Sequence, residues 1–244
     1  MIGKPFIILS SVDSTNNHAM QLIRDGEVST GTAIFAIEQT NGKGQRGRIW
    51  ESTIGKNIML TVVLDAERFS LMDQFPVSAA VILGCYDFFS AYAGEETSIK
   101  WPNDLYWRDR KAGGVLMENI VGEGKWKWSV IGIGININQE TFDTYRNKAV
   151  SLKQITGKDF DSIELAKELC IYLEKRFEEI KAKSASTILF EFNKRLFKKG
   201  QVVKFKRNQI IFEATVLQTN MQGELEIQHS ITETIRQGEI EWLL

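Results

Sequence analysis

The sequence predicts an α+β fold in which a mixed or antiparallel sheet carries flanking helices and a small all-β unit follows. Two observations lead to this prediction. Strand-like apolar runs and long helical patterns alternate up to residue 197, whereas only short alternating strands follow Gly200. At 244 residues the chain can also bury a core without disulfides or a structural metal. We therefore expect two units, residues 1–198 and 199–244, which pack directly because no proline-rich linker separates them.

Charge, cysteine and histidine content narrow the classes of function. A formal net charge of -1 argues against a surface devoted to nucleic acid or anionic lipid. Cys85 and Cys170 lie among apolar residues in helical stretches, so we expect buried thiols, and two histidines are too few for a histidine-rich metal site. Residues 1–10 do not form a signal peptide, and no apolar run reaches the roughly 18 residues of a membrane span. We expect a cytoplasmic protein with no membrane partner.

Local signals define the elements of the larger unit in order. After the apolar run at residues 6–9, Asp13-Ser14-Thr15-Asn16 is typical of a helix start, and Gly26 is typical of its end. Apolar periodicity then predicts strands at 32–38, 57–64 and 98–101, a helix at 71–92, a hairpin of 114–120 with 126–137, and helices at 162–183 and 185–197.

The segment after Gly200 has a different pattern. Short runs with alternating apolar residues predict strands at 202–206, 211–218, 224–228, 232–235 and 239–243. We interpret them as a small β-barrel.

The polar segment between the strands at 32–38 and 57–64 is the most unusual part of the chain. Gly42-Lys43-Gly44-Gln45-Arg46-Gly47 matches the dinucleotide fingerprint formally, but residues 48–56 are too short and polar for the crossover helix of a Rossmann unit. A Walker A loop is excluded because the G-K-[ST] ending is missing.

A solvated turn is one interpretation of this glycine-rich loop. The alternation of Lys43, Arg46 and Arg48 with glycines, beside the flat face of Trp50, instead favours a phosphate-bearing ligand. Such a loop should be mobile without that ligand.

Further motifs follow this loop in a fixed order. They are Lys100-Trp101-Pro102-Asn103-Asp104-Leu105, Arg110-Lys111-Ala112-Gly113-Gly114-Val115-Leu116-Met117-Glu118 and Ile131-Gly132-Ile133-Gly134-Ile135-Asn136. Together with residues 13–16 and the loop, they resemble the catalytic domain of biotin protein ligases across residues 10–140. The resemblance implies a core like that of class II synthetases, and the segment after Gly200 resembles the SH3-like C-terminal barrel of that family.

The resemblance also implies an activity. A biotin protein ligase converts biotin and ATP, with Mg²⁺, to biotinyl-5′-AMP and transfers biotin to a specific lysine of a biotin carboxyl carrier protein or domain. That carrier would belong to a biotin-dependent carboxylase, and no tightly bound prosthetic group is expected. Two alternatives stay open, namely a lipoate protein ligase or lipoyl transferase on the same fold and a non-catalytic biotin-binding module.

Site residues are assigned by the same resemblance. The groups expected to bind biotin are Ser14, Thr15, Asn16, Gln39, Gly42, Lys43, Gly44, Gln45 and Lys111. Those expected to bind ATP or the adenylate are Arg46, Arg48, Trp50, Asn103, Asp104 and Asn136, with Asp104 also at Mg²⁺. Small hydroxyl and amide groups at one end of the site and a cation at the other suit the ureido ring and carboxylate of biotin. For residues 14–16 a plain helix cap is the alternative.

The chemistry of the two steps selects among these residues. Adenylation joins two anions, so Lys111 and Arg48 are the expected catalytic cations. Transfer needs a deprotonated lysine, and Asp104 either accepts that proton or holds Mg²⁺. Lys100 either supports the structure or holds an acidic partner.

The chain departs from the family pattern at the loop, which commonly reads G-R-G-R-R-G-R. Lys43 keeps the first charge but Gln45 removes the second, so we hypothesise weaker retention of the adenylate unless Arg46 compensates. Because the catalytic motifs begin near residue 10, we expect a monofunctional ligase without a DNA-binding domain. Exposed edge strands leave a homodimer open.

Overall fold

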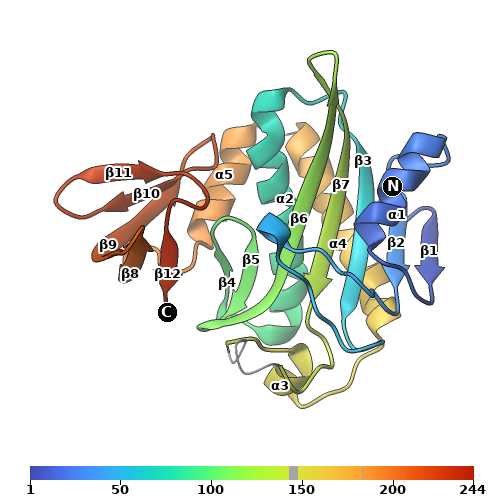
Figure 1. Cartoon of the computed structure of the whole chain (residues 1–244), viewed down its shortest axis with the longest axis horizontal. Coiled ribbons are helices and arrows are strands. Elements are labelled where there is room, and N and C mark those ends of the chain that lie inside the picture. The colour runs from blue at the N-terminus through green and yellow to red at the C-terminus, as the bar shows by residue number, and fades with distance from the viewer. Residues whose placement is uncertain (143–147, 183) are drawn as a thin grey trace.

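A seven-stranded mixed sheet forms the centre of the larger unit (Figure 1). The computed structural model describes residues 1–142, 148–182 and 184–244. The elements of the larger unit are β1 (Phe6–Leu9), α1 (Thr15–Asp25), β2 (Ala33–Ala36), β3 (Ile58–Asp65), α2 (Gln74–Ala93), β4 (Thr97–Lys100), β5 (Asp104–Trp107), β6 (Arg110–Gly122), β7 (Lys125–Ile135), α3 (Leu152–Thr156), α4 (Ser162–Ala182) and α5 (Ala185–Lys194). Two short 3₁₀ turns, Gln45–Gly47 and Leu71–Asp73, complete them. The α+β prediction is confirmed.

The strand order gives the sheet two different faces. It runs β1-β2-β3-β7-β6-β5-β4, with β1 parallel to β2 and the other pairs antiparallel. Alternate residues of β3, such as Leu60 and Val62, pack into the core formed with α2 and α4, whereas Val63 packs with Ala19 of α1 on the opposite face. The α1 face is only partly covered, so side chains that point to it from β3 to β7 are available for a site.

Helix α2 is apolar around its whole circumference. The segment Leu71–Ala93 is long and apolar enough to cross a membrane by length and composition, contrary to the expectation from sequence, but 61% of its most apolar 18-residue window is buried inside the protein. The helix contacts α4, α5 and the strands β4 to β6. Its composition is therefore that of a central core helix.

The C-terminal residues form a separate five-stranded antiparallel sheet. Its strands are β8 (Val202–Arg207), β9 (Ile210–Thr219), β10 (Leu225–Gln228), β11 (Thr232–Ile235) and β12 (Glu241–Leu243), in the order β11-β10-β9-β8-β12. The five predicted strands are present. Several contacts join this sheet to the larger unit, among them hydrogen bonds from Asn193 Nδ2 to the Thr219 carbonyl and from Trp101 Nε1 to the Gly223 carbonyl, each at 2.9 Å. The boundary at residue 198 and the barrel class stay predictions.

The local signals predicted most elements but missed three. Strands β1 and β5 have four residues each and helix α3 has five, so none of them offers enough periodicity to be recognised. The predicted helix at 185–197 ends at Lys194, and the last residue of the helix predicted at 162–183 lies outside the described residues.

Both cysteines are free and buried, as expected from sequence. Burial raises the pKa of the Cys170 thiol to about 12 and also raises that of Cys85. Thiols that stay protonated at neutral pH are poor nucleophiles, so neither residue is a catalytic candidate.

Candidate active site

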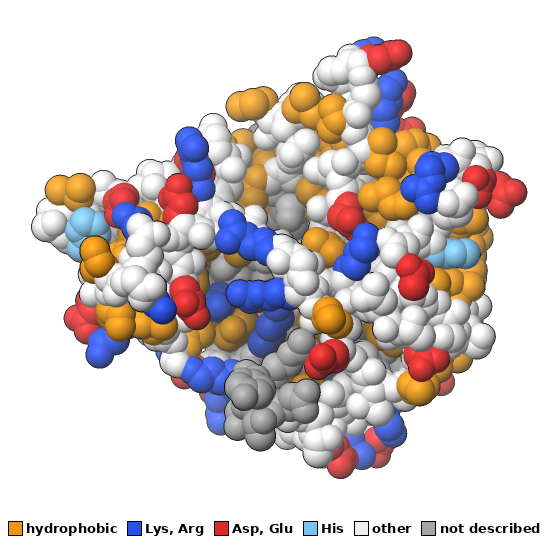
Figure 2. Space-filling view, viewed as in Figure 1, with side chains coloured by type: hydrophobic (Ala, Val, Ile, Leu, Met, Phe, Trp, Pro, Cys, Tyr) orange, Lys and Arg blue, Asp and Glu red, His pale blue; other side chains and the backbone are white. Residues whose placement is uncertain are grey.

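A cleft of about 1200 Å³ opens on the α1 face, between the glycine-rich segment, β5 to β7 and the C-terminal sheet. Figure 2 shows lysine and arginine side chains gathered around this hollow. Apart from Gly42, every predicted site residue lines it, namely Ser14, Thr15, Asn16, Gln39, Lys43, Gly44, Gln45, Arg46, Arg48, Trp50, Asn103, Asp104, Lys111 and Asn136. Residues far apart in the sequence thus meet in one place.

Strand alternation explains why these residues face the cleft. Leu105, Val115 and Ile133 point to the core with α2, so their neighbours on β5, β6 and β7 point the other way. Asp104 and Gly134 are two such neighbours, and both line the cleft.

One end of the cleft is a buried network of hydroxyl and amide groups. The Thr61 hydroxyl lies 2.7 Å from Thr15 Oγ1 and 2.6 Å from Asn16 Oδ1, and Gln39 Oε1 accepts from the Thr15 backbone N–H at 2.8 Å. Ser14 occupies the N-cap position of α1 but makes no capping hydrogen bond with its side chain. Because Gln39 satisfies a helix N–H, the Ser14 hydroxyl does not serve as the cap and is available to a ligand.

The network continues to the glycine-rich segment through Glu118, to which the sequence assigned no role. Asn16 Nδ2 donates to Glu118 Oε2 at 2.7 Å, and Lys43 Nζ lies 3.5 Å from Glu118 Oε1. The face of β7 is flat here, because a Cβ at Gly132 would overlap the Asn16 amide. Thr61 and Glu118 were both missed by sequence reasoning, although a threonine inside the apolar run at 57–64 was a visible signal.

The glycine-rich segment folds back on itself as a short hairpin, residues 42–50, which we call the glycine-rich hairpin. The Gly44 N–H donates to the Arg48 carbonyl at 2.7 Å, and the Trp50 N–H donates to the Gly42 carbonyl at 2.9 Å. Its tip is the 3₁₀ turn Gln45–Gly47. No helix lies in the described stretch between this turn and β3, which confirms that the segment is not a Rossmann unit, while mobility of the hairpin without ligand stays a prediction.

Trp50 offers a flat surface in the cleft. A Cβ at Gly134 would overlap the indole, so the ring lies directly on the β7 backbone. Lys111 Nζ lies 5.8 Å from the centroid of the ring. Within the described part of the chain the buried Trp50 Nε1 has no hydrogen-bond partner.

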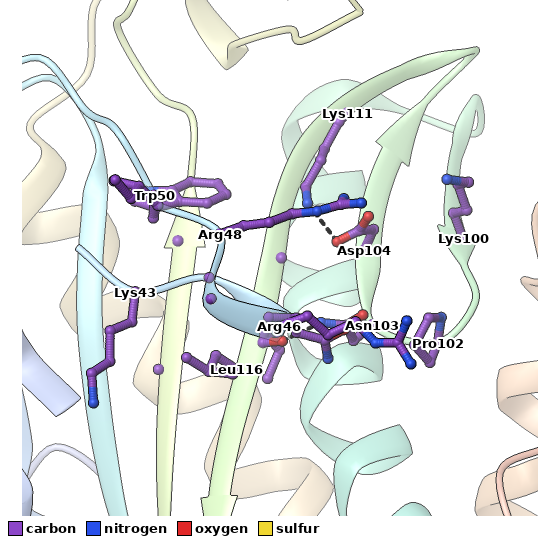
Figure 3. Close-up of a pocket in the computed structure, with 18 of the residues that line it drawn as sticks. Lys43, Arg46, Arg48, Trp50, Lys100, Pro102, Asn103, Asp104, Lys111 and Leu116 are labelled. Atoms are coloured by element: carbon purple, nitrogen blue, oxygen red, sulfur yellow. Dashed lines mark hydrogen bonds and ion pairs between the residues drawn. The ribbon is translucent and has the colours of Figure 1, made fainter. Parts of the chain in front are cut away.

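Beside Trp50 lies a pair of opposite charges (Figure 3). Lys111 Nζ is 2.6 Å from Asp104 Oδ1, and both side chains are partly exposed to the cleft. Figure 3 shows Arg48 extended from the hairpin toward this pair. The arrangement gathers two cations and one carboxylate where anionic groups of a ligand could lie.

Lys100 sits deeper in the cleft, between two aromatic rings. Its Nζ lies 5.2 Å from the Tyr106 ring centroid and 5.5 Å from that of Trp242 on β12. It forms no ion pair with a described acidic residue, since the Asp104 carboxylate contacts Lys111 instead. Burial lowers the pKa of Lys100 below its usual value; the negative charge of Asp104 opposes this shift, and the charges of Lys111 and other cations add to it. The contacts favour the structural interpretation over an acidic partner.

The two predicted asparagines shape the floor of the cleft. Asn103 Nδ2 donates to the Val115 carbonyl, and Asn136 Nδ2 donates to the Val150 carbonyl at 3.1 Å. Both side chains are buried. Their amide nitrogens therefore fix neighbouring backbone at the cleft.

The cleft has few groups that could hold a metal ion. Among the residues that the structure describes, no three His, Cys, Asp or Glu side chains cluster as a metal site. Asp104 is the carboxylate beside the cluster of cations. Magnesium binds proteins through one or two carboxylates together with substrate phosphates, so Asp104 fits a shared site of that kind.

Comparisons with known proteins agree with this geometry. Residues 8–136 match the model of the Biotin/lipoate A/B protein ligase family. The bifunctional ligase/repressor BirA of Bacillus spizizenii is 31% identical over 183 residues, which are 73% of this chain and 55% of the relative. The biotin–[acetyl-CoA-carboxylase] ligase of Paracoccus denitrificans is 34% identical over 53% of each chain. The chain spans about half the length of the curated relatives it matches.

Solved structures are similar over almost the whole chain. The biotin protein ligase from Aquifex aeolicus, in complex with biotin and ATP, has a TM-score of 0.82 and is 27% identical, covering 98% of this chain and 99% of that one. The similarity therefore includes the C-terminal sheet as well as the larger unit.

Proposed function

Since this chain belongs to the biotin/lipoate A/B protein ligase family, we propose that it activates biotin with ATP and transfers the biotinyl group to a lysine of a carrier protein. The observation that carries this proposal is the cleft itself. A buried hydroxyl and amide network lies at one end, and Lys111, Arg48 and the Trp50 ring lie further along it. A ligand with a polar ring, an apolar chain and a carboxylate would meet a suitable partner at each point.

The polar end favours biotin over lipoate. The ureido ring of biotin offers two N–H donors and a carbonyl acceptor, whereas the dithiolane of lipoate offers no comparable group. Ser14 is 1% exposed and its hydroxyl makes no capping hydrogen bond, so this buried group needs a partner from the ligand. Leaving one such group unpaired costs about 1–3 kcal/mol. A site of this kind therefore rejects an analogue that lacks the hydrogen-bonding groups.

In the first step, a biotin carboxylate oxygen would form a bond to the α-phosphorus of ATP while the bond from that phosphorus to the bridging oxygen breaks. Pyrophosphate leaves with the electron pair of the broken bond. Repulsion between the two anions is the main obstacle, and Lys111 with Arg48 would reduce it by placing positive charge between them. Trp50, whose ring lines the cleft, would receive the adenine ring on its flat face.

Magnesium would be held by Asp104 together with the phosphates, and it would neutralise part of their charge. The Lys111 ammonium lies on one oxygen of that carboxylate, Oδ1. Lys111 would thereby keep Asp104 oriented toward the cleft.

In the second step, the carrier lysine amine would attack the carbonyl carbon of biotinyl-5′-AMP. The new amide bond forms as the bond to the phosphate oxygen breaks, and AMP leaves with that electron pair. The amine must lose a proton, and Asp104, which lines the cleft, would accept it as the alternative to holding Mg²⁺. A biotin carrier domain of a biotin-dependent carboxylase is the proposed partner, supported by the names of relatives such as the Paracoccus denitrificans ligase.

Incubation of the purified chain with ATP, Mg²⁺, labelled biotin and a biotin carboxyl carrier domain tests the proposal, with lipoate and its acceptor domain in parallel. We expect biotin transfer that is lost in Lys111→Ala. Lipoate transfer would assign the chain to the other branch of the family, and binding of biotin without any transfer would favour a binding module.

A further inference from the structure

The glycine-rich hairpin touches the C-terminal sheet at one place, the turn between β11 and β12, residues 236–240. We propose that this turn holds the hairpin over the cleft, and that Gln237 and Gly238 are positioning residues for adenylate formation. The inference rests on the proposed function and adds residues from the second sheet to the site.

Two side chains at the tip of the hairpin contact Gln237. Arg46 Nη2 donates to the Gln237 carbonyl at 2.6 Å, and Gln237 Nε2 donates to Gln45 Oε1. The contacts join residues 191 and 192 positions apart in the sequence. Gln45, where the family commonly has arginine, is thus paired with a neutral amide.

Gly238 makes the approach of Arg46 to the turn feasible. A Cβ at this position would overlap the Arg46 guanidinium, and the residue has a φ of 89°, which is unfavourable for other residues. A side chain at residue 238 would therefore displace Arg46 and strain the turn.

The turn is itself braced, so it can act as a fixed support. The Glu239 N–H donates to the Arg236 carbonyl at 3.1 Å, and the Arg236 N–H donates to Glu239 Oε2 at 3.0 Å. Arg236 also contacts Glu224 at 3.1 Å. These three contacts hold residues 236–239 in place without any contribution from the hairpin.

The hairpin tip has a conformation that needs outside support. Arg46 has φ 57° and ψ 41°, the left-handed region that a non-glycine residue rarely occupies. At the base of the hairpin, Lys43 lies 3.5 Å from Glu118. The Glu118 contact at the base and the Gln237 contacts at the tip fix both ends.

Fixing the tip also fixes Arg48, the proposed catalytic cation. The Arg48 N–H donates to the Gln45 carbonyl at 3.2 Å, and its own carbonyl accepts from Gly44. Because Arg48 is part of the same turn as Arg46, loss of the support would misplace its charge relative to the phosphates. Thr15 and Asn16 on α1 would keep their positions, because Gln39 and Glu118 hold them.

The test compares Gln237→Ala and Gly238→Ala with a matched control, Gln218→Ala. Gln218 lies on β9 of the same sheet, exposed and paired with Glu226 at 2.9 Å, outside the cleft. Biotin-dependent exchange of pyrophosphate into ATP gives KM and kcat, and calorimetry gives the Kd for biotin. For both test variants we expect KM for ATP to rise and biotinyl-adenylate to be released faster, each about 3- to 10-fold, with a smaller rise in the Kd for biotin.

Hydrogen exchange of the Gly44 and Trp50 amides without ligand gives a readout that needs no activity. Faster exchange in Gln237→Ala and Gly238→Ala, but not in Gln218→Ala, supports the inference. Exchange rates and KM values equal to those of the wild type would overturn it. Failure of the wild type to form an adenylate would count against the proposed function alone, since hydrogen exchange still tests the support of the hairpin.

Discussion

Thr61→Val tests the polar end of the cleft with the smallest change in shape. Thr61 is fully buried, and its hydroxyl contacts Thr15 Oγ1 at 2.7 Å and Asn16 Oδ1 at 2.6 Å. Valine keeps the volume but leaves those two oxygens short of a partner. The free energy of unfolding should fall by about 1–3 kcal/mol, the cost of a buried unsatisfied polar group.

Biotin affinity should fall as well, because Thr15 and Asn16 are no longer held in position for the ureido ring. If about 1 kcal/mol of the loss is felt in binding, the Kd rises about fivefold, since 1.4 kcal/mol corresponds to a factor of ten. Isothermal titration calorimetry measures the Kd, and urea unfolding measures the stability.

Thr97→Val is the matched control, because Thr97 is also buried and donates to the Gly94 carbonyl at 2.9 Å, at the start of β4 and away from the cleft. We expect it to lose stability without losing biotin affinity. A Thr61→Val protein that is destabilised like Thr97→Val but binds biotin as tightly as the wild type would refute the reasoning.

Three further predictions concern the charged part of the cleft. Lys111→Ala should slow adenylate formation about 100- to 1000-fold, measured by pyrophosphate exchange, and an unchanged rate would remove Lys111 from the chemistry. Gln45→Arg should reduce the release of biotinyl-adenylate without a carrier by about tenfold, because it restores a charged donor that can still reach the Gln237 amide oxygen; equal release from both proteins would contradict this. Lys100→Met removes an amine that is partly buried, and this burial lowers the pKa of the amine. In the wild type, the Lys100 amine binds its proton more tightly in the unfolded chain than in the folded protein. The free energy of unfolding of the wild type therefore rises relative to that of Lys100→Met as pH rises toward 10.5. Urea unfolding between neutral and alkaline pH measures the difference, which should stay constant if Lys100 is not desolvated.

The sequence predicted features whose signals are local. Helix α1 follows Ser14 and ends at Gly26, as the expected start and stop residues indicate, because caps act on the adjoining turn. Strand β5 was missed because its pairing with β4 and β6, not its own four residues, makes it a strand. The same limit applies to the site. The ion pair between Lys111 and Asp104 depends on the register of β5 and β6, in which Lys111 lies opposite Tyr106.

Contacts between distant segments gave no sequence signal at all. Gln237 and Gly238 reach Arg46 only because the C-terminal sheet packs beside the cleft. Glu118 lies inside a motif, but its contacts with Asn16 and Lys43 require β6, α1 and the hairpin to be adjacent. Motif order could predict which residues gather, and the fold decides which of them touch.

The excess of positive charge in the cleft distinguishes a nucleotide-using enzyme from a binding module. A site for biotin alone needs one cation for one carboxylate, yet Lys100, Arg48 and Lys148 line the cleft in addition to Lys111. Asp104 contacts Lys111, and Glu51, Glu239 and Glu241 also line the cleft, but its lysines and arginines outnumber these acidic residues. The mutual repulsion of the cations contributes to the lowered pKa of Lys100 and carries an electrostatic cost. A monoanion would offset only part of that cost, whereas ATP brings several negative charges to the same place. The charge distribution is therefore accounted for by a triphosphate and left unexplained by biotin binding alone.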